Sequence, residues 1–115
     1  MEACLKLKTR IIAGTPVIEA DGELGHAGIS EFRAEVSRLI ERGHTTIVVD
    51  MLHVDFMDSG GLSGIIYTMK QLDSLNGEVI LAGCCSRVLR KLEIGGLSKL
   101  SDALRLAPTV EHAIP

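Results

Sequence analysis

The stretch Asp58-Ser59-Gly60-Gly61-Leu62 decides the fold, because it joins an apolar strand to the start of an amphipathic helix. Before it, Ile47-Val48-Val49 is apolar without alternation, which is typical of a strand buried on both faces. After it, apolar residues recur at helical spacing and predict a helix over 59–75. We expect the core face of this helix to consist of Leu62, Ile65, Ile66, Met69 and Leu72.

Gly60 and Gly61 need an explanation, because each glycine costs a helix about 1 kcal/mol relative to alanine. One explanation is a close-approach surface, where a partner backbone or an anion reaches the unpaired N–H groups of the helix start. The other is a tight turn between strand and helix, capped by Asp58 or Ser59. The first explanation predicts that residues 58–61 lie exposed.

Outward from this stretch, the same patterns predict further strands and helices in alternation. Strand-helix-strand units favour a mainly parallel sheet, and an opening hairpin can add only an antiparallel edge. We therefore expect one α/β domain over residues 1–115, with helices covering both faces of the sheet. The predicted segments are strands 4–12 and 16–20 around a turn at 13–15, a turn over 21–25, a helix over 30–42, a strand over 45–50, the helix over 59–75, a strand over 79–82, a helix over 86–93, a last strand within 100–106 and at most a brief helix over 108–114.

Composition excludes several classes of function. The 115 residues are 46% apolar with a net charge of -3, so the core is aliphatic and nucleic acid is not an expected partner. No apolar run approaches the ~20 residues that span a bilayer, and the first ten residues do not resemble a signal peptide. Cys4, Cys84 and Cys85 form no disulfide framework and are expected to be reduced. These features predict a soluble, cytoplasmic protein without a membrane partner.

Motifs for catalysis or cofactor binding are missing. Ser59 lacks a G-x-S-x-G frame, the glycines form no nucleotide-binding loop, and the four histidines lack metal-ligand spacing. Asp50 and Asp55 flank a predicted loop that contains His53, but they are more typical of turns. We therefore predict no catalytic residue, no metal and no cofactor. The open alternative is a small enzyme or redox protein that uses Ser59 or the Cys84-Cys85 pair.

Residues 49–62, Val-Asp-Met-Leu-His-Val-Asp-Phe-Met-Asp-Ser-Gly-Gly-Leu, resemble the signature of the bacterial anti-sigma-factor antagonists, the STAS domain family. Gly22-Glu23-Leu24 and the segment 89–97, which ends in Gly-Leu, follow the family's order. The resemblance implies a regulatory domain that is not an enzyme. Its partner would be an anti-sigma factor that is also a serine kinase, and binding would free a sigma factor. Phosphorylation of a Ser or Thr at the start of the second helix would abolish that binding.

The resemblance also implies a site, from which this sequence departs at two positions. The usual phosphoacceptor position is Gly60, which has no hydroxyl, and an Asp that often follows Gly-Glu-Leu is Gly25. Ser59 and Ser63 are possible phosphoacceptors instead, although Ser59 can also be a helix cap. We expect Gly60→Ser to leave binding nearly intact and Gly60→Asp to weaken it. The expected partner-binding residues are Gly25, His26, Asp58, Ser59, Gly60, Gly61 and Leu62.

One alternative keeps the fold and changes the use of this surface. The chain can be a constitutively docked subunit of a stress-signalling or lipid-transport assembly. In either case we expect the chain alone to be a monomer or weak dimer.

Overall fold

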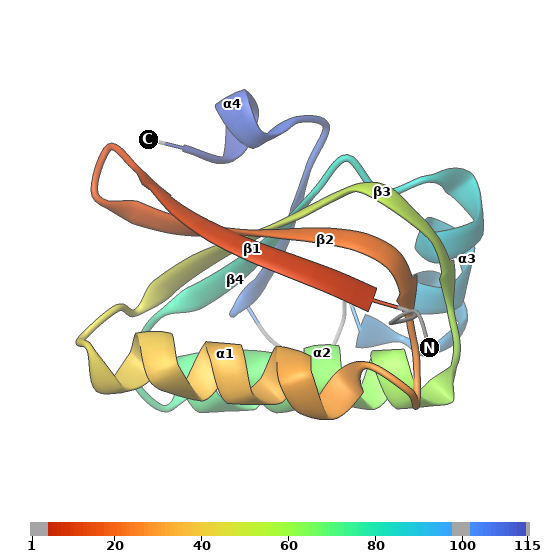
Figure 1. The fold of residues 1–115 in the computed structure, drawn as a ribbon, viewed down its shortest axis with the longest axis horizontal. Coiled ribbons are helices and arrows are strands. Elements are labelled where there is room, and N and C mark those ends of the chain that lie inside the picture. Colours follow the sequence, from red (N-terminus) through yellow and green to blue (C-terminus); the bar gives the residue numbers. More distant parts are fainter. Residues whose placement is uncertain (1–4, 98–101, 115) are drawn as a thin grey trace.

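A computed structural model describes residues 5–97 and 102–114 of the chain (Figure 1). Its strands form one sheet in the order β1-β2-β3-β4-β5, in which β1 is antiparallel to β2 and the other neighbours are parallel. The predicted α/β architecture with an antiparallel edge hairpin is confirmed. The elements are β1 (Leu5–Ile12), β2 (Thr15–Leu24), α1 (Ile29–Glu41), β3 (Thr46–Met57), α2 (Ser59–Asp73), β4 (Glu78–Ala82), α3 (Ser86–Ile94), β5 (Leu104–Ala107) and α4 (Val110–Ala113).

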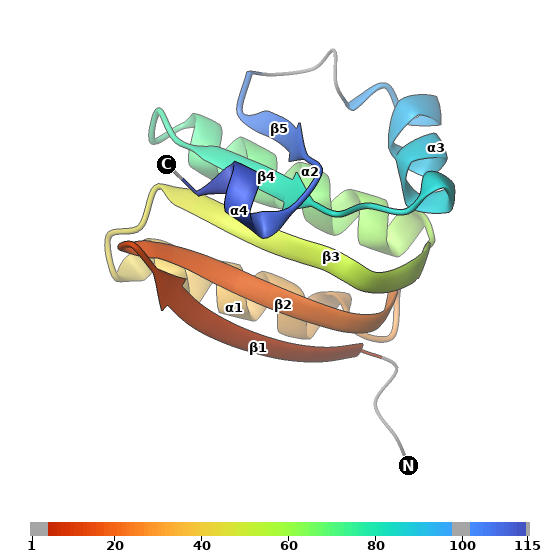
Figure 2. The same ribbon diagram turned by 90° about the horizontal axis from the view of Figure 1, so that it is seen from above.

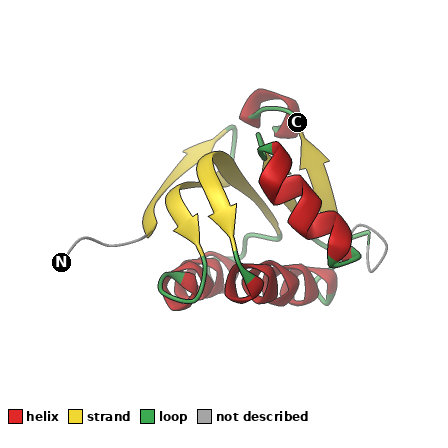
Figure 3. Cartoon of the chain, turned by 90° about the vertical axis from the view of Figure 1, so that its right-hand side faces the viewer, coloured by secondary structure: helices red, strands yellow, loops and turns green. Residues whose placement is uncertain are grey.

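The helices cover the two faces of the sheet unequally. α1 and α2 lie side by side under one face, and the short α4 lies on the other (Figures 1 and 3). The larger core joins the sheet to α1, α2 and α3, with Phe32, Ile65 and Val88 fully buried in it. A smaller cluster packs the opposite face of the sheet against Ala113 of α4. The expectation of helices on both faces is therefore confirmed, with most of the buried surface on one of them.

Two strands are longer than the sequence predicts. β2 continues to Leu24 and β3 to Met57, so the predicted turn over 21–25 and the predicted loop around His53 are wrong. Figure 2 shows these two strands side by side, and their pairing runs from Val17 and Val48 to Leu24 and Met57. Part of the last predicted strand, residues 98–101, lies outside the described residues, and β5 itself covers Leu104–Ala107.

The extension of β3 escapes prediction because its pairing with β2 is irregular. Glu19 pairs with Asp50, but Asp21 pairs with His53, so β3 holds one extra residue there. A second shift follows between Gly22 and Glu23. Such bulges break the alternation of buried and exposed side chains. The buried residues of this half of β3 are accordingly spaced by three, at Met51, Val54 and Met57.

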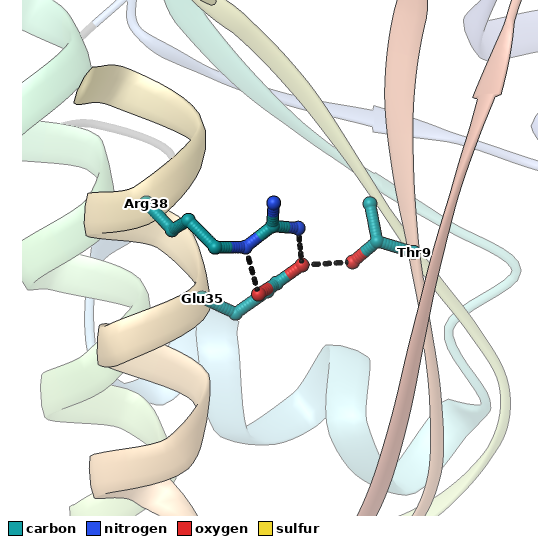
Figure 4. Close-up of polar contacts among 3 residues, drawn as sticks. All are labelled: Thr9, Glu35 and Arg38. Atoms are coloured by element: carbon teal, nitrogen blue, oxygen red, sulfur yellow. Dashed lines mark hydrogen bonds and ion pairs between the residues drawn. The ribbon is translucent and has the colours of Figure 1, made fainter. Parts of the chain in front are cut away.

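The edge strand β1 is fastened to α1 by polar side chains. Glu35 accepts a hydrogen bond from Thr9 of β1 and further bonds from the guanidinium of Arg38, the one from Nε being 2.8 Å long (Figure 4). The hydrogen bond from Arg38 is the largest influence on Glu35 and, with that from Thr9, lowers the pKa of the carboxyl despite partial burial. The hairpin of β1 and β2 closes through Ala13 and Gly14, both with positive φ, as expected for a two-residue turn.

The predicted core stripe of α2 is only partly buried. Ile65, Met69 and Leu72 are buried, whereas Leu62 and Ile66 are half-buried at the margin of the core. Between the helices, Gly64 lets α1 come close, because a Cβ there would lie 2.0 Å from Ile29 Cδ1. The prediction that the whole stripe is buried is therefore right for three of its five residues and wrong for Leu62 and Ile66.

Candidate docking site

The candidate site lies at the edge of the sheet where β2 and β3 end. Leu24 at the end of β2 pairs with Met57 at the end of β3, and the two strands are parallel. The two segments of the chain that follow them therefore leave the sheet side by side. The segment after β2 forms the loop 25–28 and α1, and the segment after β3 forms α2 (Figures 1 and 3). The fold thus brings the predicted residues 25–26 and 58–62 together from two distant parts of the sequence.

Asp58 is the residue that joins these two segments. Its Oδ1 accepts hydrogen bonds from Gly60 N–H at 2.8 Å and Gly61 N–H at 3.1 Å, and its Oδ2 accepts one from His26 N–H at 3.3 Å. Burial acts to raise the pKa of Asp58, but the hydrogen bonds from Gly61, His26 and Gly60 outweigh it and lower the pKa. Asp58 is therefore the helix cap, and the alternative that Ser59 is the cap is wrong.

Gly61 and Gly25 are explained by contacts within the chain. A Cβ at Gly61 would lie 1.9 Å from the carbonyl oxygen of Leu24, so α2 starts directly against the end of β2. A Cβ at Gly25 would lie 2.7 Å from Asp58 Oδ2, where it would displace the carboxylate that caps the helix. Both glycines are buried. Close approach is indeed what they permit, but the approaching groups belong to the same chain.

Gly60 is covered by the imidazole of His26. A Cβ at position 60 would lie 2.7 Å from His26 Nδ1 and 2.9 Å from its backbone nitrogen. The prediction that residues 58–61 are exposed is therefore wrong for Gly60 and Gly61, which are buried, and right for Ser59. The effect of Gly60→Ser on partner binding therefore stays a prediction, and in this structure the new side chain would require the His26 ring and its loop to shift.

The two serines differ in their surroundings. Ser59 is the first residue of α2 and is exposed, and its Oγ lies 3.5 Å from His26 Nε2, the outer limit of a hydrogen bond. Ser63 is exposed one turn later, and its hydroxyl donates to the carbonyl of Gly60 at 2.8 Å. Leu62 is half-buried and packs against the core. The exposed side chains of the site are thus those of His26, Ser59 and Ser63.

The pairing of His26 with Ser59 was missed by sequence reasoning. The two residues are 33 positions apart, and no spacing rule connects a residue after a strand with one at a later helix start. From the sequence, His26 is expected only as one residue of the partner-binding surface. The signal that exists is indirect: a glycine at position 60 leaves room for a neighbouring side chain.

The other residues considered from the sequence do not form a second site of this kind. Asp50, His53 and Asp55 lie on β3 instead of in a loop. Cys84 and Cys85 are free thiols and both are half-buried; burial raises the pKa of Cys84 to about 11. Cys4 lies outside the described residues.

Within residues 5–97 and 102–114, no group of three or more His, Cys, Asp or Glu side chains is placed to bind a metal ion. In the same part of the chain, every helix is too short or too polar to cross a bilayer.

The comparison with known families decides the relationship. The model of the STAS domain matches residues 6–113. The chain belongs to the STAS domain family. The sequence resemblance is thus confirmed over nearly the whole chain, and the β3–α2 junction described above is part of this STAS domain.

Proteins similar to this STAS domain include anti-sigma factor antagonists and, by fold alone, a sulfate transporter family protein. An anti-sigma F factor antagonist from Lysinibacillus sphaericus is 32% identical over 84 residues, which are 72% of this chain and 72% of the relative. The solved structure of the anti-sigma factor antagonist SpoIIAA in its unphosphorylated form is 27% identical, with a TM-score of 0.70 over 95% of this chain and 93% of that one. A sulfate transporter family protein from Wolinella succinogenes has the same fold, with a TM-score of 0.74 over 90% of this chain and 84% of that one, at 18% identity.

Proposed function

We propose that this STAS domain is a cytoplasmic anti-sigma factor antagonist, a binding protein and not an enzyme. It binds an anti-sigma factor and thereby frees a sigma factor. The observation that carries the proposal is the junction of β3 and α2, where Asp58 caps the helix and holds the loop 25–28 against it. The names of the relatives at 32% and 27% identity support it.

The proposed docking surface consists of the exposed side chains at this junction. Ser59 and His26 provide the polar contacts, while Asp58, Gly25, Gly60 and Gly61 hold the backbone in shape beneath them. Leu62 contributes at most its exposed part, because it also packs against the core. A surface fixed in this way can bind without rearrangement, which reduces the entropic cost of association.

The proposed switch is phosphorylation of Ser59 or Ser63 by the anti-sigma factor, acting as a serine kinase. A phosphate at either place adds about -1.5 to -2 charges at pH 7. Both hydroxyls are exposed, whereas position 60 offers none. Added negative charge next to the Asp58 carboxylate would repel a partner that accepts the unmodified surface.

A second candidate is a subunit that stays docked in a larger assembly. The covered Gly60, which lacks a hydroxyl and lies under His26, favours it, because the usual acceptor position cannot be phosphorylated. The shared fold of a sulfate transporter family protein is compatible with this candidate.

Binding and phosphate transfer separate the two candidates. The tagged chain is used to isolate its partner from the native organism, and the purified partner is then titrated with wild type, Ser59→Asp and Ser86→Asp by calorimetry. Ser86 is the matched control, since it is likewise the exposed first residue of a helix, α3. The proposal expects an anti-sigma factor whose Kd rises at least tenfold with Ser59→Asp and stays unchanged with Ser86→Asp.

Incubation of the two proteins with ATP, followed by intact-mass measurement, completes the test. One added phosphate on Ser59 or Ser63 supports the switch. Stable binding without any added phosphate would favour the constitutive subunit. A partner unrelated to sigma factors would refute the first candidate.

A further inference from the structure

The imidazole of His26 lies at the start of α2, in contact with Gly60 and next to Ser59. It fills the space over Gly60, and its Nε2 lies 3.5 Å from Ser59 Oγ. Its backbone N–H donates to Asp58 Oδ2, which fixes the loop that carries the ring. Both His26 and Ser59 are exposed, so a partner enzyme can reach the hydroxyl while the ring remains beside it.

We propose that His26 is a positioning residue for a phosphoryl group on Ser59. Gly60 has no hydroxyl, so the hydroxyl next to the ring is that of Ser59, and the imidazole then binds the phosphate placed there. This inference rests on the proposed function, in which a kinase partner supplies the phosphoryl group from ATP. The bond from Ser59 Oγ to the γ-phosphorus forms, the bond from that phosphorus to the β–γ bridging oxygen breaks, ADP leaves, and the hydroxyl proton passes to solvent.

Geometry and charge both favour this role for His26. The oxygens of a phosphate extend beyond Ser59 Oγ, so they can close the 3.5 Å gap to the ring. A protonated imidazole donates from both nitrogens and offsets the phosphate charge. The Asp58 carboxylate, which caps this helix start, opposes the phosphate. Without His26, the phosphate would face that carboxylate with only the helix N-terminus to stabilise it.

Ser63 lacks such a neighbour. Among the described residues, its side-chain hydrogen bond goes to the carbonyl of Gly60 and not to a cationic group. A phosphate on Ser63 would therefore gain less from His26 than a phosphate on Ser59. This difference between the two serines makes the inference testable in the isolated chain.

The test uses chains in which phosphoserine is incorporated during synthesis, as Ser59→phosphoserine and, for the control, Ser63→phosphoserine. Each is made with His26 and with His26→Ala, and the phosphorus NMR signal is followed against pH. We expect the titration midpoint of the phosphate at position 59 to lie about half a unit lower with His26 than with alanine. His26→Gln, which keeps a donor without the charge, should lie between them, and the midpoint at position 63 should respond less to His26→Ala than the midpoint at position 59.

Equal midpoints at position 59 with and without His26 would overturn the inference, as would a larger His26 effect at position 63. Because no partner protein is present, either result would leave the docking proposal standing. Failure of the docking proposal would appear instead in the calorimetry with the purified partner.

Discussion

Gly61→Ala sets two physical effects of opposite sign against each other. In an ordinary helix position, replacing glycine with alanine stabilises by about 1 kcal/mol. Here the new Cβ would lie 1.9 Å from the Leu24 carbonyl oxygen and 2.8 Å from its carbon. Both are backbone atoms, so no side chain can turn aside and α2 must move away from β2.

The steric effect should decide the sign. Overpacking costs about 1–3 kcal/mol and occasionally more, and a clash between two backbones belongs at the upper end. After the gain in helix propensity, we expect a net loss of about 2 kcal/mol, which corresponds to a fall in Tm of roughly 10 °C for a domain of this size.

The assay is thermal and urea unfolding of wild type, Gly61→Ala and a matched control, Gly95→Ala. Gly95 also has a right-handed backbone, and its Cβ would meet the end of the Leu62 side chain at 3.0 Å, which can turn away. We expect the control to change stability by less than about 1 kcal/mol. A Gly61→Ala variant at least as stable as wild type would refute the close approach of α2 to β2 on which the site depends.

Three further predictions concern the core, an ion pair and a thiol. Ile65→Ala should cost about 2–5 kcal/mol in urea unfolding, and Ile66→Ala should cost less because Ile66 is only half-buried; equal losses would contradict the burial described for α2. The pKa of Glu35 is lowered in the folded chain, so its stabilising effect is present above its pKa in the unfolded chain and is lost as pH falls. The difference in unfolding free energy between wild type and Glu35→Gln should therefore shrink from about pH 7 to about pH 3. A difference that grows towards the acidic end would contradict the lowered pKa. With its pKa raised to about 11, Cys84 should remain a protonated thiol at pH 8 and react with iodoacetamide slowly, gaining speed only towards pH 11; fast labelling of Cys84 in the folded chain at pH 8, read by peptide mass spectrometry, would disprove its burial.

The fold was predictable because its signals are local. The apolar run at residues 47–49, the helical stripe through Ile65 and Met69, and the turn at Ala13-Gly14 each indicate one element without information from elsewhere. The missed parts depend on pairing. The second half of β3 carries two bulges against β2, so its buried residues follow a period of three that matches neither strand nor helix.

The candidate site was predictable in its position and not in its contacts. The sequence singled out residues 58–62, and the structure places them beside the loop 25–28. The sequence could not reveal that Gly61 accommodates the Leu24 carbonyl or that His26 covers Gly60, because these contacts join segments more than 30 residues apart. The predicted exposure of the two glycines was wrong for this reason. A glycine in the sequence indicates that another group comes close, but it does not indicate whether that group belongs to a partner or to the same chain.

The most direct test of the proposed function is release of a sigma factor from its complex. The purified anti-sigma factor is first bound to a fluorescently labelled sigma factor, and the chain is then added while fluorescence anisotropy is recorded. We expect wild type to lower the anisotropy to that of free sigma factor, Ser86→Asp to do the same, and Ser59→Asp to need at least a tenfold higher concentration. An anti-sigma factor that binds the chain and still retains its sigma factor at saturation would contradict the account.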